Sequence, residues 1–256
     1  MGAVTTASVH DVLGTPVTMP VEIRSARCFV AGFTASSAAV SDAIASRGAA
    51  DLRPLEIRRG RTPCMLVFVD YIDGDLGPYN EFGVCFLVQP PGSRASRISA
   101  LRSLAAGDAH ALIHELPVDG DFTRAAGRGI WGFPKVIGQF DVDHDSAAKR
   151  GRISIDGELV AELSVGRGIP VPDASGDTVL QAYSQLDGVT RRTPWRLTST
   201  SGTRTRLGGA RLTLGDHPIG ADLGRLGLSR RALMTTSVAD LSMTFADAVE
   251  IARRED

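Results

Sequence analysis

Lysine is the residue type that this 256-residue chain almost lacks. Its 28 basic residues include only Lys135 and Lys149, and all the others are arginines. Lys149 lies in the polar stretch 145–150, whereas Lys135 lies among the apolar side chains of residues 130–138. Arginine keeps its proton in proteins, but a desolvated lysine can lose it. An amine in an apolar pocket has its charged form disfavoured and becomes a nucleophile near neutral pH, so Lys135 is the first catalytic candidate.

An excess of one charge, long apolar runs and cysteine motifs are missing as well. The net charge of −1 provides no basic field for nucleic acid or for an anionic membrane. No apolar stretch approaches the roughly 18 to 20 residues of a membrane span, and no secretory signal is expected at the N-terminus. Cys28, Cys64 and Cys85 lack metal-ligand spacing and lie in apolar runs, which predicts buried free thiols in the reducing cytoplasm.

The 28 glycines and 13 prolines are spread along the chain, which favours many short strands joined by turns. Strands are predicted at 26–33, 64–71, 81–88, 109–118, 136–143, 151–155, 158–165, 179–186, 193–200, 203–214 and 232–243. An Asp156-Gly157 pair between two alternating runs predicts a tight hairpin. Helices are predicted at 36–46, 97–106 and 245–254.

These elements do not alternate strand and helix, so a doubly wound sheet is not expected. They predict a mainly β (α+β) fold, with one domain over residues 1–256. Its antiparallel strands are expected to close as a barrel or to pack as a sandwich, beside a few short helices.

Two short patterns have the residue spacing of known motifs but lack the secondary structure that those motifs require. Residues 127–132 read G-x-G-x-x-G, but Pro134 interrupts the helix that a dinucleotide-binding motif needs. His110 and His114 stand four residues apart, as zinc ligands do on a helix. Their run alternates like a strand, so surface-facing histidines are favoured over a metal site.

Glu81 is the carboxylate of most interest, because an apolar run follows it directly. It is either partly buried with a partner or solvated at the entrance of a strand. Lys135 has an equivalent alternative, in which its stem covers apolar surface and its amine reaches solvent.

Three segments resemble the acetoacetate decarboxylase family. Gly127-Arg128, followed after four residues by Phe133-Pro134-Lys135, resembles the segment with that family's Schiff-base lysine. The run 77–81, Gly-Pro-Tyr-Asn-Glu, resembles its glutamate segment, and residues 211–218 with Leu223 and Leu226 are similar to its closing segment. The resemblance covers nearly the whole chain in the expected order.

The resemblance implies a single-domain, closed, cone-like antiparallel β-barrel with an apolar internal pocket, usually in a homo-oligomer. No metal and no organic cofactor is required. By position, Lys135 would form an imine with a small keto substrate, and Glu81 would be the acid/base or orienting carboxylate. Arg128 would bind the substrate carboxylate or hold the lysine turn. Substrate-binding candidates also include Tyr79, together with Trp131 and Phe133, which would form pocket wall or core.

The implied function is a lyase that decarboxylates a small β-keto acid through a lysine imine and an enamine. The decarboxylase that names the family has a second lysine directly after the catalytic one, where this chain has Val136, and the stretch 64–68 lacks an expected acidic residue. These departures leave open an aldolase-dehydratase or biosynthetic tailoring enzyme with the same imine. A third alternative is a non-catalytic barrel that binds a small ligand, with Lys135 merely lining its pocket.

Overall fold

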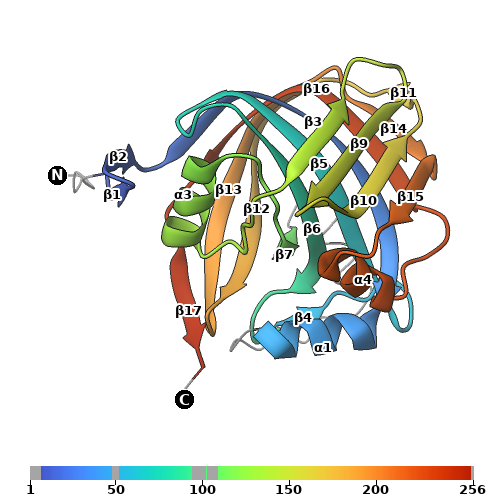
Figure 1. The fold of residues 1–256 in the computed structure, drawn as a ribbon, viewed down its shortest axis with the longest axis horizontal. Coiled ribbons are helices and arrows are strands. Elements are labelled where there is room, and N and C mark those ends of the chain that lie inside the picture. Colours follow the sequence, from blue (N-terminus) through green and yellow to red (C-terminus); the bar gives the residue numbers. More distant parts are fainter. Residues whose placement is uncertain (1–6, 48–51, 94–101, 103–108, 255–256) are drawn as a thin grey trace.

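Seven strands close on themselves to form a barrel in the computed structural model, which describes residues 7–47, 52–93, 102 and 109–254 (Figure 1). Around the ring the strands are β16 (Met234–Phe245), β3 (Val21–Ser36), β5 (Arg61–Gly74), β6 (Tyr79–Gln89), β7 (His110–Glu115), β12 (Ala174–Leu186) and β13 (Val189–Ser201). A pairing between β13 and β16 completes the ring. Neighbouring strands are antiparallel except β7 and β12, which are parallel. The predicted mainly β, closed-barrel class is therefore confirmed.

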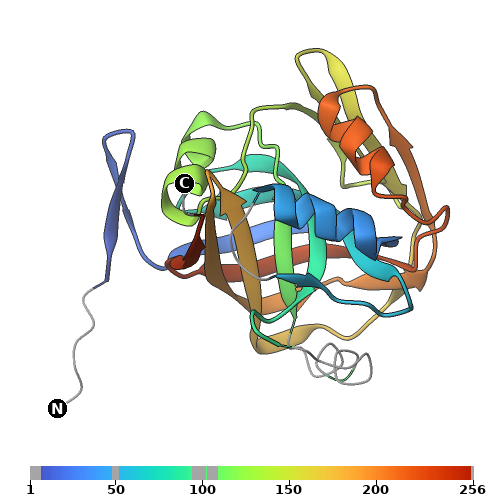
Figure 2. The ribbon, with the colours of Figure 1, turned by 90° about the horizontal axis from the view of Figure 1, so that it is seen from below.

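A second sheet of four strands packs beside the barrel, with a helix next to it (Figure 2). Its order is β15 (Ala210–Leu214), β10 (Glu158–Val165), β9 (Lys149–Ile155) and β8 (Gln139–Asp143), and the adjacent helix is α4 (Pro218–Arg225). The predicted hairpin joins β9 to β10, and both Asp156 and Gly157 have positive φ there.

The remaining elements are short or lie at the periphery. They are β1 (Val9–Val12), β2 (Thr15–Thr18), α1 (Ser37–Arg47), β4 (Arg53–Pro54), α3 (Asp121–Trp131), β11 (Ile169–Pro170), β14 (Arg204–Leu207) and β17 (Val249–Arg253). The hairpin of β1 and β2 projects from the body of the molecule (Figure 2). Within the described ranges, no helix is both long and apolar enough to cross a membrane.

Several predicted elements differ from the structure. The helix expected at 245–254 is wrong, because residues 249–253 form β17 and pair with β13. The strand expected at 203–214 is interrupted by Gly208 and Gly209, both at positive φ, and becomes β14 and β15. The helix expected at 97–106 lies almost entirely outside the described residues. Neither α3 nor α4 was predicted.

The barrel wall separates two apolar cores, because alternate residues of a strand point to opposite faces. All seven ring strands contribute to the first, which we name the inner core; its members include Cys28, Tyr71 and Ile113. The second, the outer core, lies between the barrel and the four-stranded sheet with α1 and α4. Cys28, Cys64 and Cys85 are all free thiols, the first two buried and the third half-buried.

Phe68 packs against other aromatic rings of the outer core. Its side chain is 1% exposed, and its ring centroid is 5.3 Å from that of Phe29 and 4.7 Å from that of Phe82. We expect Phe68→Ala to lower the free energy of unfolding by about 3–5 kcal/mol, because the ring is lost and a cavity remains. Leu207→Ala, at a side chain that is 88% exposed, should change it by less than about 0.5 kcal/mol. Urea denaturation measures both, and equal losses would contradict this assignment of the core.

Candidate active site

A small cavity inside the barrel contains Lys135. It is lined by Tyr71, Leu76, Tyr79, Glu81, Leu116, Trp131, Phe133, Lys135, Trp195 and Phe245. Strands on opposite sides of the ring, β6 and β13 among them, supply these residues, so the cavity lies within the ring. The centre of a water molecule can occupy about 10 Å³ of this cavity, so the cavity has room for about one water.

The amine of Lys135 is buried and contacts three neighbouring groups. The residue is 3% exposed, and Nζ lies 2.9 Å from Oε2 of Glu81. Nζ also donates a hydrogen bond of 2.9 Å to Oγ1 of Thr123 and lies 4.8 Å from the ring centroid of Tyr79. The alternative of a lysine that reaches solvent is therefore wrong. The amine is held in the inner core between a carboxylate, a hydroxyl and an aromatic face.

The end of α3 places this lysine. The helix ends at Gly132, whose φ of 64° turns the chain, and the N–H of Phe133 donates to the carbonyl of Gly127 at 2.9 Å. A tight turn around Pro134 follows, in which the N–H of Lys135 donates to the carbonyl of Phe133 at 2.8 Å. This turn presents the lysine side chain, and it follows a helix that the sequence did not predict.

Backbone pairing then fixes the lysine segment to the strand of the glutamate. The N–H of Val118 donates to the carbonyl of Val136 at 2.9 Å, and Val118 also forms a β-bridge with Glu81. The short segment after β7 therefore lies between Glu81 and Lys135 and sets their separation.

Glu81 is the second buried member of the site. It is 5% exposed, and its Oε1 accepts a hydrogen bond of 3.0 Å from the hydroxyl of Tyr71. Burial, with an added contribution from the Glu81 charge, raises the pKa values of Tyr71 and Tyr79 well above the usual 10. Both phenols therefore keep their protons. The alternative of a solvated glutamate at a strand entrance is wrong.

The predicted substrate-binding residues divide between cavity and surface. Tyr79, Trp131 and Phe133 all line the cavity, with Trp131 and Phe133 stacked at a centroid distance of 5.8 Å. Arg128 is exposed and does not line it; its Nη1 lies 3.5 Å from the carbonyl of Lys135. Of its two expected roles, this position favours holding the lysine turn. Val136 packs against the outer core, so its side chain points away from the amine.

Sequence reasoning missed six residues of the site, two of which, Leu76 and Leu116, are apolar lining residues. Thr123 bonds the amine, Tyr71 bonds the carboxylate, and Trp195 and Phe245 complete the wall. The sequence did contain an indication of Thr123. It belongs to a set of small or apolar residues at positions 123, 126, 127, 130 and 131, which recur with helical spacing and form the buried face of α3. The two wall residues come from β13 and β16, and only closure of the ring brings them near Lys135.

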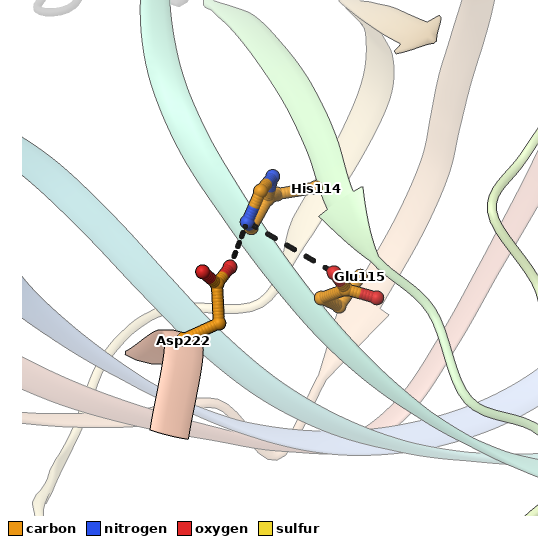
Figure 3. Close-up of side chains that lie close together, drawn as sticks. All are labelled: His114, Glu115 and Asp222. Carbon is orange, nitrogen blue, oxygen red and sulfur yellow. Dashed lines mark hydrogen bonds and ion pairs between the residues drawn. The ribbon is translucent and has the colours of Figure 1, made fainter. Parts of the chain in front are cut away.

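A separate polar cluster lies on the outer side of the barrel wall, at His114 (Figure 3). Nε2 of His114 donates to Oδ2 of Asp222 at 2.9 Å and lies 4.0 Å from Oε1 of Glu115, and its ring packs on Phe86. His114 is 3% exposed, so the predicted surface-facing histidine is wrong; His110 is half-buried and bonds the hydroxyl of Tyr183.

The ligand atoms of this cluster are close enough together to hold a metal ion. However, the guanidinium of Arg47 bonds both Glu115 and the carbonyl of His114, and it already supplies a positive charge there. The cluster ties α1, β7 and α4 together, which favours a structural role.

The chain matches the family described as Acetoacetate decarboxylase (ADC) over residues 18–250. No curated protein matches it. Among solved structures it is similar to the acetoacetate decarboxylase of Legionella pneumophila, with 18% identity, a TM-score of 0.66 and coverage of 91% of this chain and 88% of that one.

Two other structures have comparable folds. One is described as "Structural Studies of Acetoacetate Decarboxylase", with 17% identity, a TM-score of 0.64 and 95% coverage of both chains. The other is the enduracididine biosynthesis enzyme MppR, complexed with the condensation product of pyruvate and imidazole 4-carboxaldehyde. It has 16% identity, a TM-score of 0.60 and coverage of 91% of this chain and 90% of the other. At sequence identities of 16–18%, the likeness to these structures establishes the fold alone.

Gly127 is required by the close approach of the lysine stem to α3. A Cβ added there would lie 2.5 Å from Cδ of Lys135, whereas one added at Gly129 on the same helix meets nothing within 4 Å. We expect Gly127→Ala to lower the free energy of unfolding by about 1–3 kcal/mol through overpacking. Gly129→Ala should raise it by about 0.5–1 kcal/mol. Urea denaturation distinguishes them, and a stabilising Gly127→Ala would contradict this packing.

The His114–Asp222 bond makes a prediction about pH. The hydrogen bond from His114, the largest cause, lowers the pKa of Asp222 to about 2. A depressed pKa stabilises the fold above the unfolded value near 4, and that contribution is lost as pH falls toward 2. Asp222→Asn should therefore cost about 1 kcal/mol of unfolding free energy at pH 7, with the difference from wild type shrinking below pH 4.

Urea denaturation at several pH values tests this, with Asp216→Asn as the control because Asp216 is an exposed carboxylate near the same helix. A pH-independent difference for Asp222→Asn would contradict the assigned cause.

Proposed function

The chain belongs to the acetoacetate decarboxylase family, and from this premise we propose that it is a lyase that decarboxylates a small β-keto acid through an imine on Lys135. The observation that carries the proposal is the buried contact of 2.9 Å between Nζ of Lys135 and Oε2 of Glu81. Within the described residues, Lys135 is the only nitrogen nucleophile of the cavity, and a carboxylate lies within reach of its proton.

The reaction begins when Lys135 passes a proton to Glu81 and its neutral Nζ attacks the keto carbon. The keto oxygen leaves as water after gaining two protons, and a protonated imine remains. The bond between the α-carbon and the carboxylate then breaks, its electron pair enters the enamine, and carbon dioxide departs. Protonation of the enamine carbon and hydrolysis of the imine release the ketone and restore the amine.

Glu81 is suited to accept the proton of the Lys135 amine and to give it up again later in the reaction. Its Oε2 faces the amine while its Oε1 accepts from Tyr71, so the carboxyl group is held in one orientation. Tyr71 and Thr123 keep the neighbouring polar atoms satisfied while the proton moves. In a cavity this dry, charges interact more strongly than in water, which helps the iminium withdraw electrons from the breaking bond.

The charge distribution of the cavity favours decarboxylation over its main rival. Apart from Lys135, the cavity-lining set among the described residues contains no cation. A carboxylate that leaves as neutral carbon dioxide loses its charge in the reaction, so it needs no fixed cation. A retained carboxylate, such as that of pyruvate in an aldol condensation, would remain buried and uncompensated.

The rival is an aldolase-dehydratase, or a biosynthetic tailoring enzyme, that uses the same imine. MppR, which has the same fold, is described in complex with a condensation product of pyruvate. The decarboxylase that gives the family its name has a second lysine directly after the catalytic one. This chain has Val136 at that position, which also favours the rival. Condensation of pyruvate with aldehydes, compared with carbon dioxide release from β-keto acids, distinguishes the two reactions.

The remaining parts of the proposal are supported by the family resemblance, the net charge of −1 and the cysteine pattern. We propose a homo-oligomer that works in the cytoplasm on a small keto substrate, with no nucleic-acid or membrane partner and no organic cofactor or metal. A non-catalytic barrel that binds a ligand remains the alternative of a different class, and the following experiment addresses it.

Lys135→Ala should abolish covalent trapping by a β-keto acid or ketone plus borohydride, and should reduce carbon dioxide release by about a thousandfold or more. Lys149→Ala is the matched control. Lys149 is the only other lysine, and its Nζ bonds the carbonyl of His144 at a surface turn. Mass spectrometry of the trapped protein and a panel of β-keto acids provide the readouts.

Retained trapping in Lys135→Ala, or no trapping in the wild type, would exclude the imine mechanism. Circular dichroism and the melting temperature establish whether each variant is folded.

A further inference from the structure

The cavity around Lys135 is almost entirely aromatic. Six of its ten lining residues are Tyr, Trp or Phe, from four different strands and the end of α3. Trp195 packs edge-on against Phe133 at a centroid distance of 5.8 Å and lies 5.1 Å from Phe245. A substrate carboxylate entering this space must therefore find its hydrogen bonds from very few groups.

The other side-chain polar groups of the wall already have partners. The hydroxyl of Tyr71 donates to Glu81, and Lys135 bonds both Glu81 and Thr123. Nε1 of Trp131 donates to the carbonyl of Ala246 at 2.8 Å. The Tyr79 hydroxyl interacts with Thr123 and Tyr71.

Trp195 is the exception. Its Nε1 is buried and finds no acceptor in the described part of the chain. A buried N–H without an acceptor destabilises the fold, so folded proteins rarely leave one unpaired without a reason. An indole nitrogen can only donate, so its partner must be an acceptor such as an oxygen.

We propose that the indole N–H of Trp195 binds the carboxylate of the keto acid and so selects acids over neutral ketones. The inference rests on the proposed function, since it concerns the substrate held by the Lys135 imine. A neutral donor suits a group that will leave as carbon dioxide, because it orients the carboxylate without a full opposing charge that would stabilise it in the ground state. Trp195 is then a specificity-determining residue, in a position where a cation would oppose the reaction.

The test is Trp195→Phe, which keeps an aromatic ring in the wall and removes the N–H. For the β-keto acid most active with the wild type, starting from acetoacetate, KM should rise about 10- to 100-fold, the effect of one hydrogen bond to a charged group. The acetone concentration that gives half-maximal borohydride trapping should change less than about twofold, because acetone has no carboxylate.

Trp131→Phe is the matched control, since it removes an indole N–H that already has a protein acceptor. It should shift the acid and acetone readouts by the same factor. Melting temperatures of all three proteins confirm that each is folded.

The outcomes distinguish this inference from the proposed function. Trapping of acetone by wild type and Trp195→Phe alike, with an unchanged KM for the acid, would overturn the role of Trp195 and leave the imine mechanism standing. An equal rise in both readouts would make Trp195 a wall residue only. Failure of the wild type to trap any carbonyl compound would reject the proposed function and this inference together.

Discussion

The contact between Lys135 and Glu81 is the interaction on which the rest of the site depends. Removing a charged pair from water is costly unless each member has further hydrogen bonds. Thr123 supplies one to the amine and Tyr71 one to the carboxylate, while Tyr79 places an aromatic face near the amine. The pair therefore requires a helix, a turn and two barrel strands to meet at one point, which makes the closed ring a condition for the site.

The two faces of the barrel wall have different tasks. The outer face packs against a second sheet and two helices, and its polar cluster at His114 ties helices to a strand. The inner face supplies the partner carboxylate and much of the aromatic wall, and the turn after α3 brings the amine to them. Leu116 lines the cavity only two residues after His114, so the outer ties and the inner site share one short segment.

Local pattern was enough to predict a mainly β fold and the hairpin at Asp156-Gly157, and the scarcity of lysine singled out Lys135. The closed barrel, and Glu81 as the partner of Lys135, came from the family resemblance. Local pattern was not enough to predict α3, because Gly127 and Gly129 lower its helix propensity. Residues 249–253 became a strand through pairing with β13, a tertiary effect that a short window does not contain. Trp195 and Phe245 lie far from Lys135 in sequence, and only the register of β13 and β16 brings them to it.

The parallel pairing of β7 with β12 is the one departure from an otherwise antiparallel ring. Between these strands the chain makes α3, the lysine turn and most of the second sheet. Assembly of the ring must therefore wait for a long-range event, which disfavours rapid folding. Lys135 belongs to this intervening stretch, but the wall of its cavity also needs Trp195 from β13 and Phe245 from β16. The amine is therefore enclosed only after the whole ring has closed, and a partly folded chain would expose an ordinary solvated lysine.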